Sequence, residues 1–326
     1  MERELALEVV RVTELAALAS ASWVGRGSKH EADDAATEAM RKMFGSLSIR
    51  GTVVIGEGEM DEAPMLYIGE KLGAGAGPEV DVAVDPLEGT ELAARGLGNA
   101  ISVLALAPRG QLLHAPDMYM EKLAVGPQLA GRLSLSDPIS TTIRKASREL
   151  GKPLSELTVL LLDRERHAPL IRELRELGVR IRLLTDGDVA GAMAPCYPET
   201  GVDLYVGSGG APEGVLAAAA IKCLGGEMQG RLMPDGEEQL QRCAEMGIAD
   251  PARVLRTSDM VGSGDVIFAA TGVTPGDFLE GVRYLPGRIA HTHSVVMRAA
   301  TRTVRYIHTR HDLSLKSVLR SEQAIG

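Results

Sequence analysis

An apolar, β-branched run that ends in two acids lies in the first third of the chain, Val80-Asp81-Val82-Ala83-Val84-Asp85-Pro86-Leu87-Glu88-Gly89-Thr90. Its first five residues predict a buried strand, the proline that follows predicts a turn, and the closing Gly-Thr pair can open a helix. Open α/β sheets bind ligands beyond the carboxyl ends of their strands, so Asp85, Glu88 and Thr90 are expected to point into one crevice. The simpler alternative is a strand-to-helix turn in which Asp85 and Thr90 act only as caps.

The same arrangement recurs after a second predicted strand, Thr52 to Ile55, which runs into Gly56-Glu57-Gly58-Glu59-Met60-Asp61-Glu62. Four acids in one glycine-rich loop repel one another, which favours a bound cation. The alternative is an acidic loop that is only solvated. Mg²⁺ and Mn²⁺ take oxygen ligands from carboxylates, waters and phosphate. Two such ions could hold a phosphate ester and generate a hydroxide nucleophile.

Three further segments follow predicted strands and suit a phosphorylated sugar. The first is Gly207-Ser208-Gly209-Gly210-Ala211-Pro212-Glu213-Gly214, at the start of a predicted helix, where free backbone N–H groups suit phosphate. Glu213 in this segment is either a ligand or a residue that stabilises the helix dipole. The two arginines of Asp163-Arg164-Glu165-Arg166-His167 match phosphate oxygens, unless they only begin a charged helix. Asp186-Gly187-Asp188 offers acceptors for sugar hydroxyls, or a helix cap.

Strands and helices that alternate along the chain predict an α/β layered protein. The lobe boundary is placed near Gly151-Lys152-Pro153, which gives an N-terminal lobe of residues 1–150 with most of the metal ligands and a C-terminal lobe of residues 151–326 with most of the sugar-phosphate contacts. The predicted helices cover residues 3–20, 30–44, 168–177, 212–224 and 237–246. The predicted strands cover residues 52–55, 80–84, 101–107, 157–162, 180–184, 202–206 and 266–270, with a final pair over 293–297 and 301–308.

Composition narrows the class of partner. The chain has 326 residues, 45% of them hydrophobic, and a formal net charge of −9, with no long Lys/Arg run, which disfavours a nucleic acid or an anionic membrane. No apolar stretch reaches the length of a membrane span, and the charged N-terminus is unlike a signal peptide. The three cysteines, Cys196, Cys223 and Cys243, are far apart and do not predict disulfides. A cytoplasmic protein that acts on a small molecule is expected.

Four histidines near the C-terminus raise the alternative of a zinc site, in the spacings His291-x-His293 and His308-x-x-His311. On a strand, the first pair would share a face. No Cys or acidic residue with metal-ligand spacing accompanies them, so we interpret them as surface histidines.

The order of these motifs resembles the class II fructose-1,6-bisphosphatases, the GlpX-type family, over nearly the whole chain. Asp-Pro-x-Glu-Gly-Thr is shared with the wider lithium-sensitive sugar-phosphatase superfamily. The longer blocks Asp61 to Glu70 and Gly209 to Gly214 are much more specific to the GlpX-type family. The resemblance rests on the following blocks: Trp23-Val24-Gly25-Arg26-Gly27-x-Lys29, Ala32-Asp33, Val54 to Glu59, Asp61-Glu62-Ala63-Pro64-Met65-Leu66-Tyr67-Ile68-Gly69-Glu70, Asp85 to Thr90, Ala115-Pro116-Asp117-Met118-Tyr119-Met120-Glu121-Lys122-Leu123, Arg166-His167, Asp186 to Asp188 and Gly209 to Gly214.

The resemblance implies a phosphoric monoester hydrolase of gluconeogenesis, with two or more Mn²⁺ or Mg²⁺ ions and an αβαβα sandwich of mixed sheets. It implies hydrolysis of the C1 phosphate of fructose 1,6-bisphosphate by a homo-oligomer, dimer or tetramer. The implied metal ligands are Asp33, Glu57, Asp85, Glu88 and Glu213, and the implied catalytic residues are Thr90, Asp61, Glu59 and Lys29. The implied substrate contacts are Glu88, Gly89, Thr90, Tyr119, Lys122, Arg164, Glu165, Arg166, Asp186, Gly187, Asp188 and Gly210.

Two departures from the family pattern stand out. Ser28 replaces an acid, and the connection between Arg231 and Cys243, near residue 235, looks shorter than in many relatives, which puts regulation inferred from relatives in doubt. The alternative functions are a dual fructose-1,6-/sedoheptulose-1,7-bisphosphatase, another sugar or inositol phosphatase, and a sugar-phosphate-binding protein without activity.

Overall fold

The computed structural model describes residues 4–58 and 64–316, and it divides into two compact units. Unit 1 comprises Met1–Gly110 and Asp265–Gly326, and unit 2 comprises Gln111–Gly264. The chain therefore leaves unit 1 once and returns to it, while the boundary expected near residue 150 lies inside unit 2. Gly151 is the left-handed residue that ends helix α5 (Ile139–Leu150), so the glycine and proline at this point mark the end of a helix.

Unit 1 is built on an eight-stranded mixed sheet. Its strand order is β12-β13-β11-β4-β3-β1-β2, with β14 paired to β13, and only β1 and β3 run parallel within it. The strands are β1 (Arg50–Ile55), β2 (Lys71–Leu72), β3 (Glu79–Glu88), β4 (Ile101–Pro108), β11 (Ile267–Gly272), β12 (Arg283–Leu285), β13 (Ile289–Arg298) and β14 (Thr303–Asp312).

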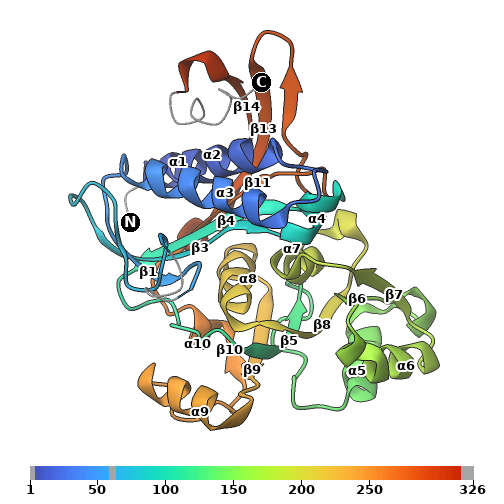
Figure 1. Ribbon diagram of the computed structural model, residues 1–326. Coiled ribbons are helices and arrows are strands. Elements are labelled where there is room, and N and C mark those ends of the chain that lie inside the picture. The colour runs from blue at the N-terminus through green and yellow to red at the C-terminus, as the bar shows by residue number, and fades with distance from the viewer. Residues whose placement is uncertain (1–3, 59–63, 317–326) are drawn as a thin grey trace. The chain divides into compact units, whose positions relative to one another are not determined.

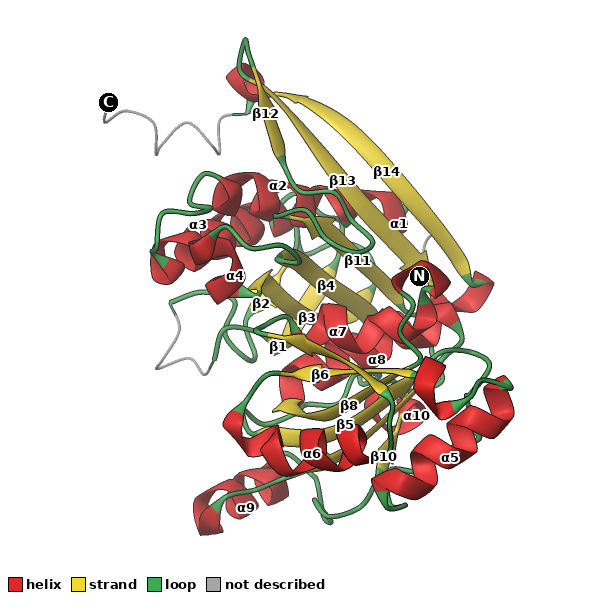
Figure 2. Ribbon diagram, turned by 90° about the vertical axis from the view of Figure 1, so that its right-hand side faces the viewer, coloured by secondary structure: helices red, strands yellow, loops and turns green. Residues whose placement is uncertain are grey.

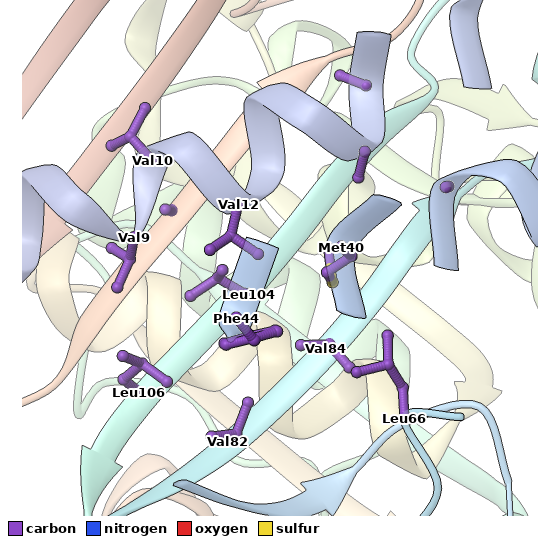
Figure 3. Packing of buried hydrophobic residues seen from close by; sticks show 14 of the residues in the cluster. Val9, Val10, Val12, Met40, Phe44, Leu66, Val82, Val84, Leu104 and Leu106 are labelled. Atoms are coloured by element: carbon purple, nitrogen blue, oxygen red, sulfur yellow. The ribbon is translucent and has the colours of Figure 1, made fainter. Parts of the chain in front are cut away.

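Helices α1 (Leu5–Glu8), α2 (Val10–Ala21) and α3 (Lys29–Phe44) cover one face of this sheet (Figure 1). Val12 of α2 and Phe44 of α3 are fully buried and point at Val82 of β3 and Leu104 of β4 (Figure 3). Such burial of large side chains supplies most of the free energy of folding, at about 25 cal/mol per Å² of apolar surface removed from water. This core fixes α3, which carries Lys29 and Asp33, and β3, which carries Asp85 and Glu88.

Unit 2 has a six-stranded mixed sheet in the order β10-β9-β5-β8-β6-β7. Figure 2 shows α5 and α6 on one face of this sheet and α7 and α8 on the other. The strands are β5 (Tyr119–Val125), β6 (Thr158–Leu162), β7 (Arg180–Leu184), β8 (Leu204–Gly210), β9 (Glu227–Leu232) and β10 (Leu255–Arg256). The remaining helices are α6 (Ala168–Glu176), α7 (Asp188–Met193), α8 (Ala211–Leu224), α9 (Gly236–Glu245) and α10 (Thr257–Met260).

Two mixed sheets with helix layers confirm the predicted α/β class. The helix expected over residues 30–44 is α3, the strand expected over 180–184 is β7, and the final strand pair is β13 with β14. The helix expected over 3–20 is divided at Val9 into α1 and α2. No helix among the described residues is both long enough and apolar enough to cross a bilayer.

Strands β5 and β9 were missing from the sequence prediction, although β5 is hydrogen-bonded on both sides in the middle of its sheet. Charged residues interrupt the pattern of β5, because Lys122 is buried there beside an acid. Gly230 weakens the strand pattern of β9, and it lies where any Cβ would meet the Met120 sulfur at 2.4 Å. Both strands thus depend on tertiary contacts that local propensity does not contain.

Candidate functional site

The segment Asp85 to Thr90 differs from the predicted strand-end turn. Strand β3 continues through Pro86 to Glu88, and its register against β4 shifts between Asp85, opposite Val103, and Glu88, opposite Ile101. The prediction of a turn at Pro86 is therefore wrong, because a β-bulge accommodates the proline inside the strand. A bulge re-aims the side chains on either side of it, which here are the two acids.

The helix predicted at the end of this segment is confirmed. Gly89 has a φ of +86° and is the residue before α4 (Thr90–Arg95), so a left-handed residue converts the strand into a helix within one position. Glu88 is 3% exposed and Thr90 is the first helical residue. A carboxylate removed from water in this way needs a compensating donor or cation.

Asp33 and Glu57 lie together in unit 1. Burial and the nearby charge of Asp34 raise the pKa of Asp33 to about 6, while His30 and a hydrogen bond with Glu57 oppose the rise. Two acids that share a hydrogen bond share one proton between them. A divalent cation could replace that proton, because carboxylate oxygens such as those of Asp33 and Glu57 are the ligands that Mg²⁺ and Mn²⁺ prefer.

The other predicted catalytic residues of unit 1 fall partly outside the described part of the chain. Lys29 is the exposed first residue of α3, at the end of the glycine-containing loop predicted from the sequence. Glu59 and Asp61 lie outside the described residues.

Glu213 occupies the first turn of α8 in unit 2, as the sequence predicted. Burial raises the pKa of its carboxyl, and Lys122 opposes that rise. Its Oε2 atom is buried and has no hydrogen-bond partner among the described residues. A Cβ on Gly210, the residue before α8, would lie only 1.9 Å from that oxygen, so the close approach of the carboxylate requires glycine there.

Lys122 and Asp188 form a buried ion pair in unit 2. The lysine is 1% exposed and the aspartate 7% exposed, and the Tyr205 hydroxyl also donates to Asp188. The cap interpretation of Asp186-Gly187-Asp188 is wrong, because Gly187 is the N-cap of α7 and the side chain of Asp188, the first helical residue, turns to the lysine. A Cβ on Gly209 would lie 1.9 Å from the Asp188 carboxylate, which explains a second glycine of the 207–214 block.

Arg166 is held by three contacts in unit 2. Its guanidinium donates to the Ser208 hydroxyl at 3.0 Å and to the Ser208 carbonyl at 2.7 Å, and it lies 4.5 Å from the centre of the Tyr119 ring. His167 supports Ser208 in turn, because its Nε2 accepts from the Ser208 amide at 2.8 Å. Arg166 is therefore oriented before any ligand arrives, with part of its surface exposed.

Arg164 and Glu165 complete this segment. Arg164 donates to the Thr185 carbonyl at 2.5 Å and lies 3.6 Å from the Asp186 carboxylate, and Glu165 is exposed. Ser208 and the buried His167 were not among the predicted site residues. A strand serine flanked by glycines carries no local signal of a contact across 42 residues.

The donor set fits hard divalent cations. Asp33 and Glu57 share a hydrogen bond, and Glu213 has a buried oxygen without a partner among the described residues. Within the described residues, no three His, Cys, Asp or Glu side chains lie together as a ready metal-binding group. A divalent cation would therefore take one or two carboxylate ligands at each place, and water or phosphate oxygens would complete its coordination, as is usual for Mg²⁺.

Comparisons with known proteins agree with this chemistry. A family model described as bacterial fructose-1,6-bisphosphatase, glpX-encoded, matches residues 3–311. The chain is 51% identical to fructose-1,6-bisphosphatase 1 class 2 of Escherichia coli strain K12, and the match covers 97% of each chain. It is 48% identical to fructose-1,6-bisphosphatase class 2 of Haemophilus influenzae, over 96% of this chain and 97% of that protein.

Replacement of Lys122 by Met is expected to destabilise the protein by about 3–5 kcal/mol, since it leaves Asp188 buried without its cation. Urea unfolding at pH 7 measures this loss. The matched control is Lys145→Met, which removes a partly exposed pair with Asp137 at 2.7 Å and should cost about 1 kcal/mol or less. Equal losses in the two variants would contradict a structural role for the buried pair.

Asp33 should make stability without metal depend on pH. Its folded pKa of about 6 lies above the ordinary value of 3.8, so the protonated carboxyl stabilises the fold below about pH 4 and that contribution is lost as the pH rises through 6. Asp33→Asn should flatten the fall in melting temperature between about pH 4 and 6.5 in EDTA.

The control for this pH dependence is Glu31→Gln, an exposed residue of the same helix, which should keep the slope of the parent. The same slope in parent and Asp33→Asn would show that the Asp33 carboxyl does not titrate in this range.

Proposed function

Since the chain belongs to the family of bacterial glpX-encoded fructose-1,6-bisphosphatases, we propose that it hydrolyses the C1 phosphate of fructose 1,6-bisphosphate. The products are fructose 6-phosphate and inorganic phosphate, as gluconeogenesis requires. The observation that carries this function is identity of about half the residues to class 2 fructose-1,6-bisphosphatases over 97% of the chain.

Asp33, Glu57, Asp85, Glu88 and Glu213 are proposed as the ligands of two or more Mn²⁺ or Mg²⁺ ions. Bound ions of this kind neutralise phosphate charge and lower the pKa of a coordinated water. The raised pKa of Asp33 and of Glu213 supports the assignment, because each carboxyl lacks enough positive charge around it to stay ionised easily. The Lys122 ammonium is the only cation that lowers the pKa of Glu213 within the described residues.

The residues of the chain have distinct roles around the reacting phosphate. Thr90, with its hydroxyl at the start of α4, orients the phosphate or the attacking water. Lys29 supplies positive charge at the start of α3, and Asp61 or Glu59 is the proposed proton acceptor. A base of this kind typically contributes about 10²–10⁴-fold to the rate.

The remote C6 phosphate is assigned to Arg164, Arg166 and Tyr119. Arg166 supports this role best, since Ser208 and the Tyr119 ring fix its guanidinium in advance. Glu165 is an exposed neighbour of this pair. The sugar hydroxyls are assigned to polar residues and glycines from four segments of the chain: Glu88, Gly89, Lys122, Asp186, Gly187, Asp188 and Gly210.

Sedoheptulose 1,7-bisphosphate is the second candidate substrate, because it carries the same two terminal phosphates that Arg166 and the carboxylates would recognise. The dimeric or tetrameric assembly and the cytoplasmic location expected from the sequence stay predictions.

Removal of metal and removal of Asp85 should both abolish phosphate release from fructose 1,6-bisphosphate. EDTA should stop turnover and added Mn²⁺ or Mg²⁺ should restore it, while Asp85→Asn should lose about 10²-fold or more at saturating metal. Glu79→Gln, an exposed acid of the same strand, is the control and should keep parental activity. Full activity in EDTA, or in folded Asp85→Asn, would overturn the metal assignment.

Arg166→Gln should act on the remote phosphate. Loss of the guanidinium is expected to raise KM for fructose 1,6-bisphosphate about tenfold or more, with little effect on fructose 1-phosphate, which lacks the second phosphate. Arg172→Gln on the exposed surface of α6 controls for the loss of one positive charge. A similar loss with both substrates would place Arg166 elsewhere in the mechanism.

A further inference from the structure

Arginine and histidine side chains from three adjacent strands form one cluster on the β12-β13-β14 part of unit 1. Arg283 of β12 lies opposite His291 of β13, which lies opposite Arg310 of β14. Two residues along the same face, His293 of β13 lies opposite His308 of β14. We call these five residues the hairpin cluster; Figure 2 shows the strands that carry them side by side.

The two histidines of the second row are stacked, with ring centres 4.0 Å apart. Nδ1 of His293 accepts the backbone N–H of Glu280 at 3.0 Å, so in the neutral ring the proton lies on Nε2. That Nε2 atom is buried and has no hydrogen-bond partner among the described residues. A buried donor without an acceptor costs free energy. An acceptor bound beside the His293 Nε2 atom would remove that cost.

The hairpin cluster lines a cavity of about 130 Å³. A single water needs about 10–15 Å³ measured in the same way, so the cavity has room for a polyatomic ion. Its lining includes two arginines, three histidines and one acid, Glu280, which pairs with Arg283 at 3.0 Å. Arg310 forms no ion pair with any residue in 4–58 or 64–316.

Arg283 and Arg310 lie on either side of His291, and the one acid of the lining, Glu280, pairs with Arg283. The charge of Arg310 is therefore left without a compensating acid in the lining. A bound anion would neutralise that charge and would also give the His293 Nε2–H its acceptor. Guanidinium groups and imidazoles together are the side chains that recognise phosphate oxygens.

We propose that the hairpin cluster binds a small phosphate-bearing anion, at residues distinct from those assigned to the substrate. The ligand is either inorganic phosphate or the phosphoryl group of a phosphorylated metabolite, since both present the same oxygens. The inference does not depend on the reaction proposed above, because none of its residues belongs to the assigned catalytic or substrate-binding set.

Pairing of β14 with a second copy is the other explanation for an exposed edge strand. The exposed Arg305 and Arg310 of β14 oppose it, since charged residues on an edge strand discourage pairing of strand with strand. A second copy would bring the same positive charges to the edge, whereas a phosphate would neutralise them.

Phosphate binding can be followed on the full-length chain by NMR of the labelled histidine rings, in EDTA and at constant ionic strength. Inorganic phosphate and phenyl phosphate are titrated separately, and His293→Gln identifies the signal of that ring. The pKa of His293 is lowered by burial and by His308, and an anion beside Arg283, Arg310, His291 and Glu280 should raise it. Arg310→Gln is the test variant.

Arg305→Gln is the matched control, because it removes the same charge from β14. Residue 305 is an odd number of positions from His308 and Arg310, so its side chain lies on the opposite face of the strand. Saturable shifts of the His293 and His308 signals are expected, with a midpoint at least about tenfold higher in Arg310→Gln and unchanged in Arg305→Gln. Tighter binding of phenyl phosphate would identify a phosphorylated metabolite, and binding of inorganic phosphate alone would identify the free ion.

Three results would overturn the proposal: no saturable shift, equal shifts with chloride at the same ionic strength, or shifts that follow protein concentration and not phosphate. The last result would identify the cluster as a contact between copies of the chain. Because activity toward fructose 1,6-bisphosphate is measured separately, failure here leaves the proposed reaction untouched.

Discussion

Carboxylates removed from water are the constraint on which the candidate site depends. Burial raises the pKa of Asp33 in unit 1 and of Glu213 in unit 2, so each unit holds an acid that ionises reluctantly without added positive charge. Each lies at a point that the fold controls tightly, on a core helix in one case and in the first turn of α8 in the other. The backbone around them follows from this constraint, since Gly210 must lack a Cβ for the Glu213 carboxylate to fit.

The two units meet the constraint differently. In unit 2 the chain supplies its own cation, because Lys122 is buried against Asp188 and also lowers the pKa of Glu213. In unit 1, Asp33 and Glu57 share a hydrogen bond, and the charge of His30 lowers the pKa of Asp33 without cancelling the rise. In both units a divalent cation is the proposed source of further positive charge, since the pKa of Glu213 stays raised even beside Lys122.

The sequence predicted what depends on local pattern and order. Helix α3 and strand β7 follow from apolar periodicity, and Glu57 and Glu213 follow strands as predicted, whereas Asp85 and Glu88 lie within β3. The prediction was wrong at Pro86, because proline usually ends a strand, whereas here a β-bulge accommodates it. The buried Lys122 hid strand β5, and the support of Arg166 by Ser208 and His167 joins segments that only the tertiary fold brings together.

The metal-ligand assignment can be tested directly by anomalous diffraction from crystals grown with Mn²⁺. The account predicts manganese peaks coordinated by carboxylate oxygens of Asp33, Glu57, Asp85, Glu88 and Glu213. Peaks at these residues that disappear in crystals of Asp85→Asn would support it further. Manganese bound only elsewhere, for example at the stacked pair His293 and His308, with none of the five carboxylates as a ligand, would contradict it.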